Sequence, residues 1–129
     1  MKKQVKTRGK VLVVEDDQNW QEYARRQIGG KGYDVLTAFS ATEALQILRR
    51  SKEQGKSLDI VVTDINLIGM HGTELIQILR EEEKFDGQIA IVAGLPVPKE
   101  FIERYDLLGG YIKGSDGYLP LIDRYESLK

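Results

Sequence analysis

The sequence predicts one α/β domain in which five parallel strands form a doubly wound sheet with five helices on its two faces. Short apolar runs alternate with amphipathic segments along the whole chain. Two of the runs, residues 11–14 and 60–63, show no two-residue alternation, which is typical of strands buried on both faces. Alternation at this spacing favours parallel strands with right-handed crossovers. We expect the strand order 2-1-3-4-5.

The first two strands, residues 11–14 and 33–38, are each followed by a predicted helix. One side of the first helix carries the apolar spacing i, i+3, i+4, i+8 in Trp20, Tyr23, Ala24 and Ile28. Gly29 and Gly30 end this helix. Ser40 and Glu43 have the spacing of a capping box and begin the second helix. Its buried side comprises Ala41, Ala44, Leu45 and Leu48.

The remaining strands are residues 58–63, 89–93 and 111–113, again alternating with helices. Gly69 and Gly72 mark the turn before the third helix, and Pro96 and Pro98 interrupt the loop before the fourth. The apolar positions of these three helices are Leu75, Ile76, Ile78 and Leu79, then Phe101, Ile102 and Tyr105, then Tyr118, Leu121, Ile122 and Tyr125. No internal repeat or linker divides the chain, so we expect one domain over residues 10–129.

The length of 129 residues suits one domain, and the absence of cysteine excludes disulfides and thiolate metal sites. Five of the nineteen basic side chains and none of the twenty acidic ones fall within the first ten residues. We expect residues 1–9 to be a disordered basic arm, and we expect no direct binding of nucleic acid by the acidic remainder. No apolar run is long enough to cross a membrane, and no apolar segment follows the charged start, so we expect a cytoplasmic protein.

Carboxylates follow two strands that the predicted order makes neighbours. Glu15, Asp16 and Asp17 follow the first strand, and Asp64 follows the third. Ligands of such sheets bind in the crevice beyond the carboxyl ends of the strands, at the point where the strand order reverses. Clustered carboxylates without His or Cys indicate a site for Mg²⁺ or Mn²⁺ rather than zinc. With a cation present, Asp64 can attack a phosphoryl group, and Lys113 at the end of the fifth strand can reach the phosphoryl oxygens.

Three motifs of the chain resemble those of a known family. They are Val11 to Asp17, Asp59 to Leu67 with the Gly69-Met70-His71-Gly72 turn, and Gly110 to Lys113. Together they resemble the receiver domain of response regulators in two-component signalling, the CheY-like superfamily, which has a flavodoxin-like fold. The resemblance covers roughly Lys10 to the C-terminus, and its first two motifs are the specific ones.

The resemblance implies that Asp64 accepts a phosphoryl group from a sensor histidine kinase or a histidine phosphotransfer domain. It implies that Glu15, Asp16, Asp64 and the backbone carbonyl of Asn66 hold Mg²⁺, and that Lys113 contacts the phosphate. It also implies a signalling module rather than an enzyme. An output domain or a second copy would bind through the fourth helix, the fifth strand and the fifth helix.

The chain departs from the family where the phosphorylation signal is usually transmitted. Ala93 stands in the place of a Ser or Thr, Gly110 stands three residues before the lysine where an aromatic is usual, and Gly114 replaces a proline. Ile68 also replaces a proline after the acceptor. We therefore expect phosphorylation with an atypical output switch.

Two alternatives stay open. A receiver-like module that binds partners without phosphorylation is favoured by Ala93 and by Tyr111, which lies only two residues before Lys113. A nucleotide- or flavin-binding protein of the same topology would need a Gly- or Ser-rich anion cradle after the first strand, where this chain has Glu15, Asp16 and Asp17 instead.

Overall fold

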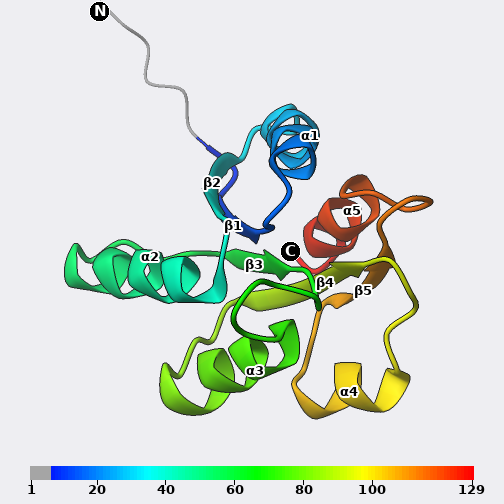
Figure 1. The fold of residues 1–129 in the computed structure, drawn as a ribbon. Helices are drawn as coiled ribbons and strands as arrows, with labels where there is room; N and C mark the ends of the chain where they lie inside the picture. Colours follow the sequence, from blue (N-terminus) through cyan, green and yellow to red (C-terminus); the bar gives the residue numbers. More distant parts are fainter. Residues whose placement is uncertain (1–6) are drawn as a thin grey trace, which may run out of the picture.

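The computed structural model describes residues 7–129, and its elements alternate as predicted (Figure 1). The strands are β1 (Lys10–Val14), β2 (Asp34–Ala38), β3 (Ile60–Thr63), β4 (Gln88–Ala93) and β5 (Gly109–Ile112). The helices are α1 (Gln18–Gly29), α2 (Ala41–Glu53), α3 (Gly72–Gln77), the π-helical η1 (Ile78–Glu82), α4 (Lys99–Arg104) and α5 (Leu119–Ser127). Within residues 7–129, no helix has both the length and the apolar character that a membrane crossing needs.

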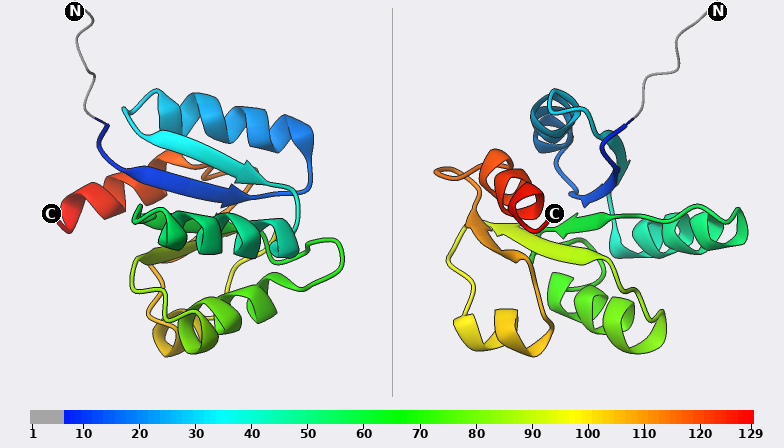
Figure 2. Two further views of the ribbon diagram at one scale, coloured as in Figure 1. Left: turned by 90° about the vertical axis from the view of Figure 1, so that its left-hand side faces the viewer. Right: turned by 180° about the vertical axis from the view of Figure 1, so that it is seen from behind.

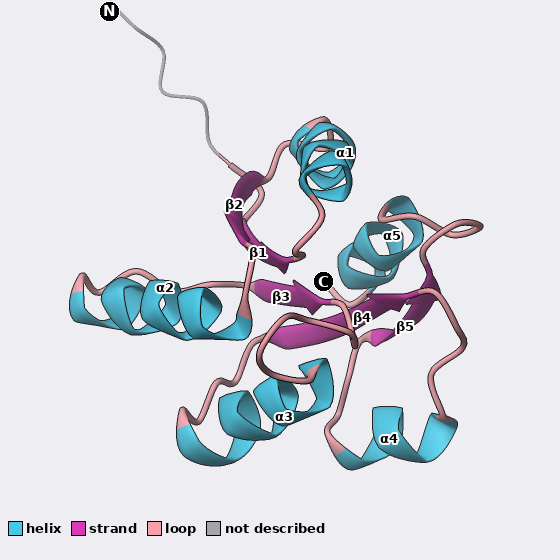
Figure 3. Ribbon diagram, in the orientation of Figure 1, coloured by secondary structure: helices cyan, strands magenta, loops and turns pink. Residues whose placement is uncertain are grey.

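The five strands form one sheet in the order β2-β1-β3-β4-β5, and all four pairs are parallel (Figure 3). The predicted order is confirmed. In the β1–β3 pair, Val14 lies opposite Thr63, so these two strands end at the same level. This register brings the residues after both strands to one edge of the sheet, because parallel strands all end at that edge.

Helices cover both faces of the sheet (Figure 2), and an apolar cluster packs on each face. Val11 and Val13 of β1 pack with α1 and α5, whereas Leu12 and Val14 pack with α2 and α3. Successive side chains of a strand point to opposite faces, so a strand covered on both sides must be apolar throughout. All four residues of β3 are buried, as the lack of alternation in its sequence predicted.

The capping box predicted for α2 is present, with one difference. Ser40 Oγ accepts a hydrogen bond from the amide of Glu43 at 3.1 Å, as expected. The Glu43 carboxylate accepts from the amide of Phe39 at 3.3 Å, one residue before the cap. Other element boundaries shift by one or two residues: β2 begins at Asp34 and α5 after the buried Tyr118, whereas β3 begins at Ile60 and β5 at Gly109.

The predicted basic arm is described only in part. Residues 1–6 lie outside the described residues. The amide of Arg8 donates to the carbonyl of Gly32 at 2.8 Å, and the side chain of Lys129 donates to the carbonyl of Arg8 at 3.3 Å. Arg8 therefore contacts both the α1–β2 turn and the end of the chain.

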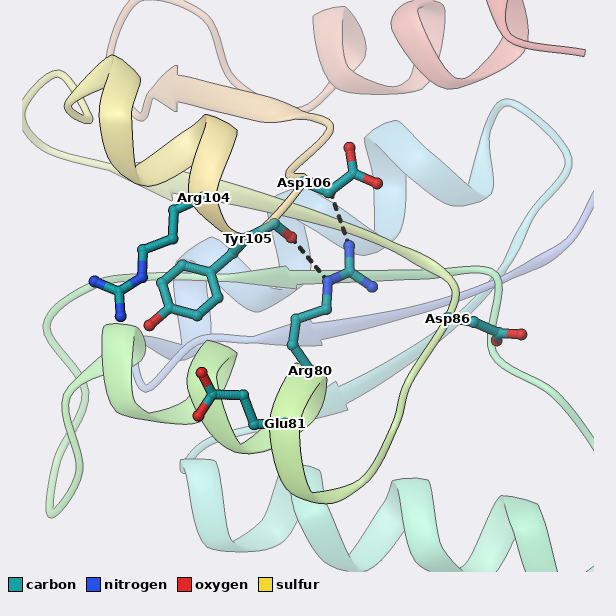
Figure 4. A pocket seen from close by; sticks show the side chains of 6 residues that line it. All are labelled: Arg80, Glu81, Asp86, Arg104, Tyr105 and Asp106. Carbon is teal, nitrogen blue, oxygen red and sulfur yellow. Dashed lines mark hydrogen bonds between the residues drawn. The ribbon is translucent and has the colours of Figure 1, made fainter.

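Arg80 in η1 is the main polar link between the third and fourth helices (Figure 4). Its guanidinium donates to the carbonyls of Phe85 and Gly87, at 2.9 and 2.7 Å, in the segment before β4. It also donates to Tyr105 and Asp106, both at 2.9 Å, at the end of α4. A cation is favourable there, because helix C-termini carry unpaired carbonyls and partial negative charge. Burial lowers the pKa of Arg80, which remains charged at every physiological pH.

We predict that Arg80→Lys lowers the free energy of unfolding by about 2 kcal/mol, because an ammonium cannot serve four carbonyls arranged around a planar fork. Chemical denaturation measures the change. Arg50→Lys on the exposed side of α2 is the matched control and should change stability by less than about 0.5 kcal/mol. Equal effects of the two substitutions would contradict the role assigned to Arg80.

Candidate functional site

The acidic residues singled out in the sequence meet at the carboxyl edge of β1 and β3. The amide of Asp64 donates to the carbonyl of Val14 at 3.2 Å, which places Asp64 beside Glu15. Glu15 is 1% exposed and Asp64 is 9% exposed, although both are acidic. Charged groups this deeply buried are costly unless they are paired. The partner of both is the same residue.

That partner is Lys113, which follows β5. The amide of Lys113 donates to the carbonyl of Ala93 at 2.7 Å, and this bond continues the β4–β5 ladder beyond the strands. Its ammonium lies 2.8 Å from Asp64 Oδ2 and also forms an ion pair with the Glu15 carboxylate. Since β4 lies between β3 and β5, the lysine side chain reaches across the end of β4, where the small side chain of Ala93 stands.

The electrostatics of this cluster follow from burial and pairing. Burial alone would lower the pKa of Lys113, but Asp64 and Glu15 together raise it, so the side chain is an ammonium at neutral pH. Burial raises the pKa of Glu15, although Lys113 and the amide of Asp17 oppose this. An ion pair normally lowers a carboxyl pKa, and here burial outweighs it. Lys113 and the Asp17 amide thus favour the charged form of Glu15, and burial opposes it.

The backbone also fixes the orientation of Asp64. Its Oδ1 accepts from the amides of Ile65 and Asn66 at 2.7 and 3.3 Å, while Oδ2 faces Lys113. The hydroxyl of Thr63 donates to the carbonyl of Asp64 at 2.9 Å. The two carboxylate oxygens therefore have different environments, one held by amides and one by a cation.

Gly72 lets α3 begin directly beside Asp64. Its amide donates to the carbonyl of Ile65 at 2.7 Å. A Cβ at this position would lie 2.9 Å from the Ile65 Cα and closer still to the Asp64 carbonyl oxygen. Only glycine fits this approach of the helix to the strand end.

Asp16, Asp17 and Asn66 are exposed at the rim of the site. Asp17 is the N-cap of α1, because its carboxylate accepts from the amides of Asn19 and Trp20 at 2.8 and 3.1 Å. Asp16 lies close enough to Glu15 to raise its pKa, although less than burial does. Asp17 thus has the capping role that a helix N-terminus predicts, whereas Asp16 has no such structural task.

A divalent cation fits this donor set only in part. Carboxylate and carbonyl oxygens are the ligands of Mg²⁺, so the chemistry is suitable. In this arrangement, however, the oxygens of Glu15 are engaged by Lys113 and by the amide of Asp17. Among residues 7–129, no three His, Cys, Asp or Glu side chains are grouped closely enough to hold a metal ion. The Asp64 oxygens are engaged in the same way, by Lys113 and by the amides of Ile65 and Asn66, whereas Asp16 and Asn66 lie exposed beside them.

Sequence reasoning missed the contact between Trp20 and Lys113. The ammonium lies 5.2 Å from the centroid of the Trp20 ring, within the range of a cation–π interaction. The helical spacing of Trp20 had indicated only packing. Its place in the first turn of the helix that follows Glu15 and Asp16 was the available signal.

The register of β5 decides which of its residues faces α4. Val92 pairs with Tyr111 and Ala93 with Ile112, so no residue is inserted or lost before Lys113. Tyr111 packs in the cluster of α1 and α5. Gly110 points to the opposite face, where a Cβ would lie 2.7 Å from the Val97 side chain. Tyr111 therefore cannot replace the aromatic that is absent at Gly110.

Comparisons with known proteins point to one family. A family model described as the response regulator receiver domain matches residues 11–104. The two-component response regulator ARR11 of Arabidopsis thaliana is 37% identical over 68 residues, which are 53% of this chain and 12% of that protein. The transcriptional regulatory protein AruR of Pseudomonas aeruginosa is 38% identical over 71 residues, 55% of this chain and 29% of that protein. The chain thus matches only a minor part of these relatives.

Solved structures share the fold across nearly the whole chain. The chemotaxis response regulator CheY4 of Vibrio cholerae superposes with a TM-score of 0.75 at 23% identity, covering 95% of this chain and 100% of that one. The response regulator TrrA of Thermotoga maritima, solved with Mg²⁺ and BeF, has a TM-score of 0.74 at 23% identity and covers 94% of this chain and 99% of that one.

We predict that Gly72→Ala lowers the free energy of unfolding by about 1–3 kcal/mol, because the added methyl group forces α3 away from the end of β3. Gly29→Ala at the end of α1 is the control, since a Cβ there would meet no atom within 4 Å. Thermal or chemical denaturation of both variants measures the difference. A Gly72→Ala protein as stable as the Gly29→Ala protein would show that the close approach is easily relieved.

Proposed function

Because the chain belongs to the family of response regulator receiver domains, which are modules of two-component signalling rather than enzymes, we propose that Asp64 is its phosphoacceptor. The phosphoryl donor is the phosphohistidine of a sensor histidine kinase or of a histidine phosphotransfer domain. The observation that carries the proposal is the buried ion pair of Lys113 with Asp64 Oδ2 at 2.8 Å.

The environment of Asp64 suits nucleophilic attack on phosphorus by one oxygen. The amides of Ile65 and Asn66 hold Oδ1, which leaves Oδ2 to face the crevice beside Lys113. Attack by Oδ2 forms the O–P bond as the P–N bond of the donor breaks and its electron pair returns to the imidazole. The ammonium of Lys113 then turns from Oδ2 to the phosphoryl oxygens and compensates part of their charge.

Receiver domains bind Mg²⁺, and we propose that Asp16, Asp64 and the Asn66 carbonyl hold Mg²⁺, or Mn²⁺, here. When bound, the cation offsets repulsion between the carboxylate and the incoming phosphoryl group. The Mg²⁺ and BeF in the Thermotoga maritima regulator support this class of cation. Glu15 is also proposed as a ligand. Its carboxylate is paired with Lys113, so it must release the lysine ammonium before it can bind the metal ion.

The same premise supports proposals for partners and location. Two-component signalling implies a histidine kinase or phosphotransfer partner in the cytoplasm. None of the six residues of α4 is buried, and α4 and α5 flank the edge strand β5 from opposite sides of the sheet, so the three elements form an open face at this edge. We propose this face for an output domain or a second copy, and no direct contact of the domain with nucleic acid.

The output switch is proposed to be atypical. Ala93 brings no hydroxyl to a phosphoryl group on Asp64. Val97 and Ile102 fill the space above Gly110, where a Cβ would lie 2.7 and 3.5 Å from their side chains. An output switch that moves a hydroxyl and an aromatic side chain would therefore find neither group here, at Ala93 or at Gly110. These contacts also favour the second candidate, a module that binds partners without phosphorylation.

We predict that a small phosphodonor with Mg²⁺ adds one phosphoryl group to the wild-type protein and none to Asp64→Asn, as measured by intact mass. Asp34→Asn is the matched control, because Asp34 is exposed at the opposite edge of the sheet. It should be phosphorylated as the wild type is. Absence of the added mass in the wild type would leave the phosphorylation-independent module, and its presence in Asp64→Asn would refute Asp64 as the acceptor.

We further predict that phosphorylation alters amide hydrogen exchange at residues 64–72 but leaves α4 and β5 unchanged, because Val97 already occupies the space above Gly110. Hydrogen exchange with and without beryllofluoride and Mg²⁺ measures both regions. Residues of α2 serve as an internal reference that should not respond. A change in α4 and β5 as large as that at residues 64–72 would show that the output face switches after all.

A further inference from the structure

We propose that Trp20 is a positioning residue for phosphoryl transfer, which holds the ammonium of Lys113 in place beside Asp64. The inference rests on the proposed function, since it gives Lys113 a third contact besides its two carboxylates. The ammonium meets Glu15, Asp64 and the face of the Trp20 ring, whose centroid is 5.2 Å away. These contacts come from β1, β3 and α1 respectively.

Trp20 has partners at both its backbone and its ring. The amide of Trp20 donates to the cap carboxylate of Asp17, and the amide of Asp17 donates to Glu15 Oε2 at 3.0 Å. The Trp20 ring packs edge-on against Tyr23, with centroids 5.5 Å apart. Tyr23 in turn lies 6.0 Å from the buried ring of Tyr118. The segment of residues 15–20 thus positions both the Glu15 carboxylate and the Trp20 ring that contact Lys113.

An aromatic contact does something for Lys113 that a third carboxylate would not. The ring attracts the cation without neutralising it, so the full positive charge remains available to a phosphoryl group. Contact with a ring face is also weakly directional compared with a hydrogen bond. The N–H groups of Lys113 can therefore turn from Asp64 Oδ2 to phosphoryl oxygens while the ammonium stays on the ring. Without the ring, the flexible lysine side chain would be confined by the carboxylates alone.

The simpler explanation is that Trp20 only packs against the apolar cluster of α1 and α5, of which it is a partly buried member. The two explanations differ in what replaces the ring. Trp20→Phe keeps an aromatic face, whereas Trp20→Leu keeps apolar bulk without one. Packing alone predicts similar behaviour of the two variants at Lys113. Positioning predicts that phenylalanine rescues what leucine loses.

The decisive measurement is the NMR signal of the Lys113 side-chain methylene protons in the unphosphorylated protein. We expect ring-current shifts in the wild type and, to a smaller extent, in Trp20→Phe, with their loss in Trp20→Leu. Tyr125→Leu is the control for a lost ring in the same cluster and should retain the shifts, because Tyr125 packs against Tyr33 and not against Trp20. Unshifted Lys113 protons in the wild type, or shifts that survive in Trp20→Leu, would overturn the proposal.

The rate of phosphorylation by a small phosphodonor with Mg²⁺ is the second measurement. We expect Trp20→Leu to react about two- to fivefold more slowly than the wild type, the factor that corresponds to a cation–π contact, and Trp20→Phe to react within about twofold of it. Equal rates for Trp20→Leu and Trp20→Phe would overturn the proposal. If no variant and no wild-type protein is phosphorylated, the proposed function fails, while the Lys113 signals still decide whether Trp20 positions it.

Trp20 is the chain's one tryptophan, so fluorescence gives a further readout that needs no variant of Trp20 itself. Lys113→Met should alter the emission of the unphosphorylated protein, because a charge near the ring is removed. Arg50→Met on the exposed side of α2 should not. Unaltered emission in Lys113→Met would count against the contact even if Trp20→Leu failed to fold.

Discussion

One buried ammonium between two carboxylates is the interaction on which the site depends. Glu15 and Asp64 can lie buried because Lys113 pairs with both, and Lys113 can reach them because β4 and β5 extend two residues beyond the level at which β1 and β3 end. An ion pair of this kind does not by itself make the domain stable, since desolvation offsets much of its attraction. Its effect is specific instead: it fixes which oxygen of Asp64 faces the crevice.

The strands, their order and the acidic edge of the sheet could be predicted from the sequence, because they follow from short-range patterns. Apolar runs define β1 and β3, and the register of parallel strands brings Glu15 beside Asp64. The sequence analysis placed Lys113 near Asp64, but the contacts of Lys113 with Glu15 and Trp20 could not be predicted, because they depend on how far a flexible side chain extends across Ala93. The hydrogen bonds of Arg80 to four carbonyls could not be predicted either. These carbonyls belong to two loops that are far apart in the sequence, and no local sequence pattern connects them.

The two faces of β5 have different neighbours. Tyr111 joins the cluster of α1 and α5, on the side from which Trp20 meets Lys113. Gly110 faces α4, where Val97 already fills the space. If Asp64 is phosphorylated as proposed, contacts run from it through Lys113 and Trp20 to α1, whereas Gly110 offers no side chain towards α4. Under that proposal, a partner that binds α1 would not need an aromatic side chain at Gly110.

The fork of Arg80 has a consequence for engineering the domain. The connection before β4 and the turn after α4 lie at the surface, where insertions are usually tolerated. Both supply carbonyls to one guanidinium, so a tag or a changed loop length in either would disturb the other. The turn after α2 is the better place for a label or a fused domain, because Gly55 has open space around it and shares no such side chain.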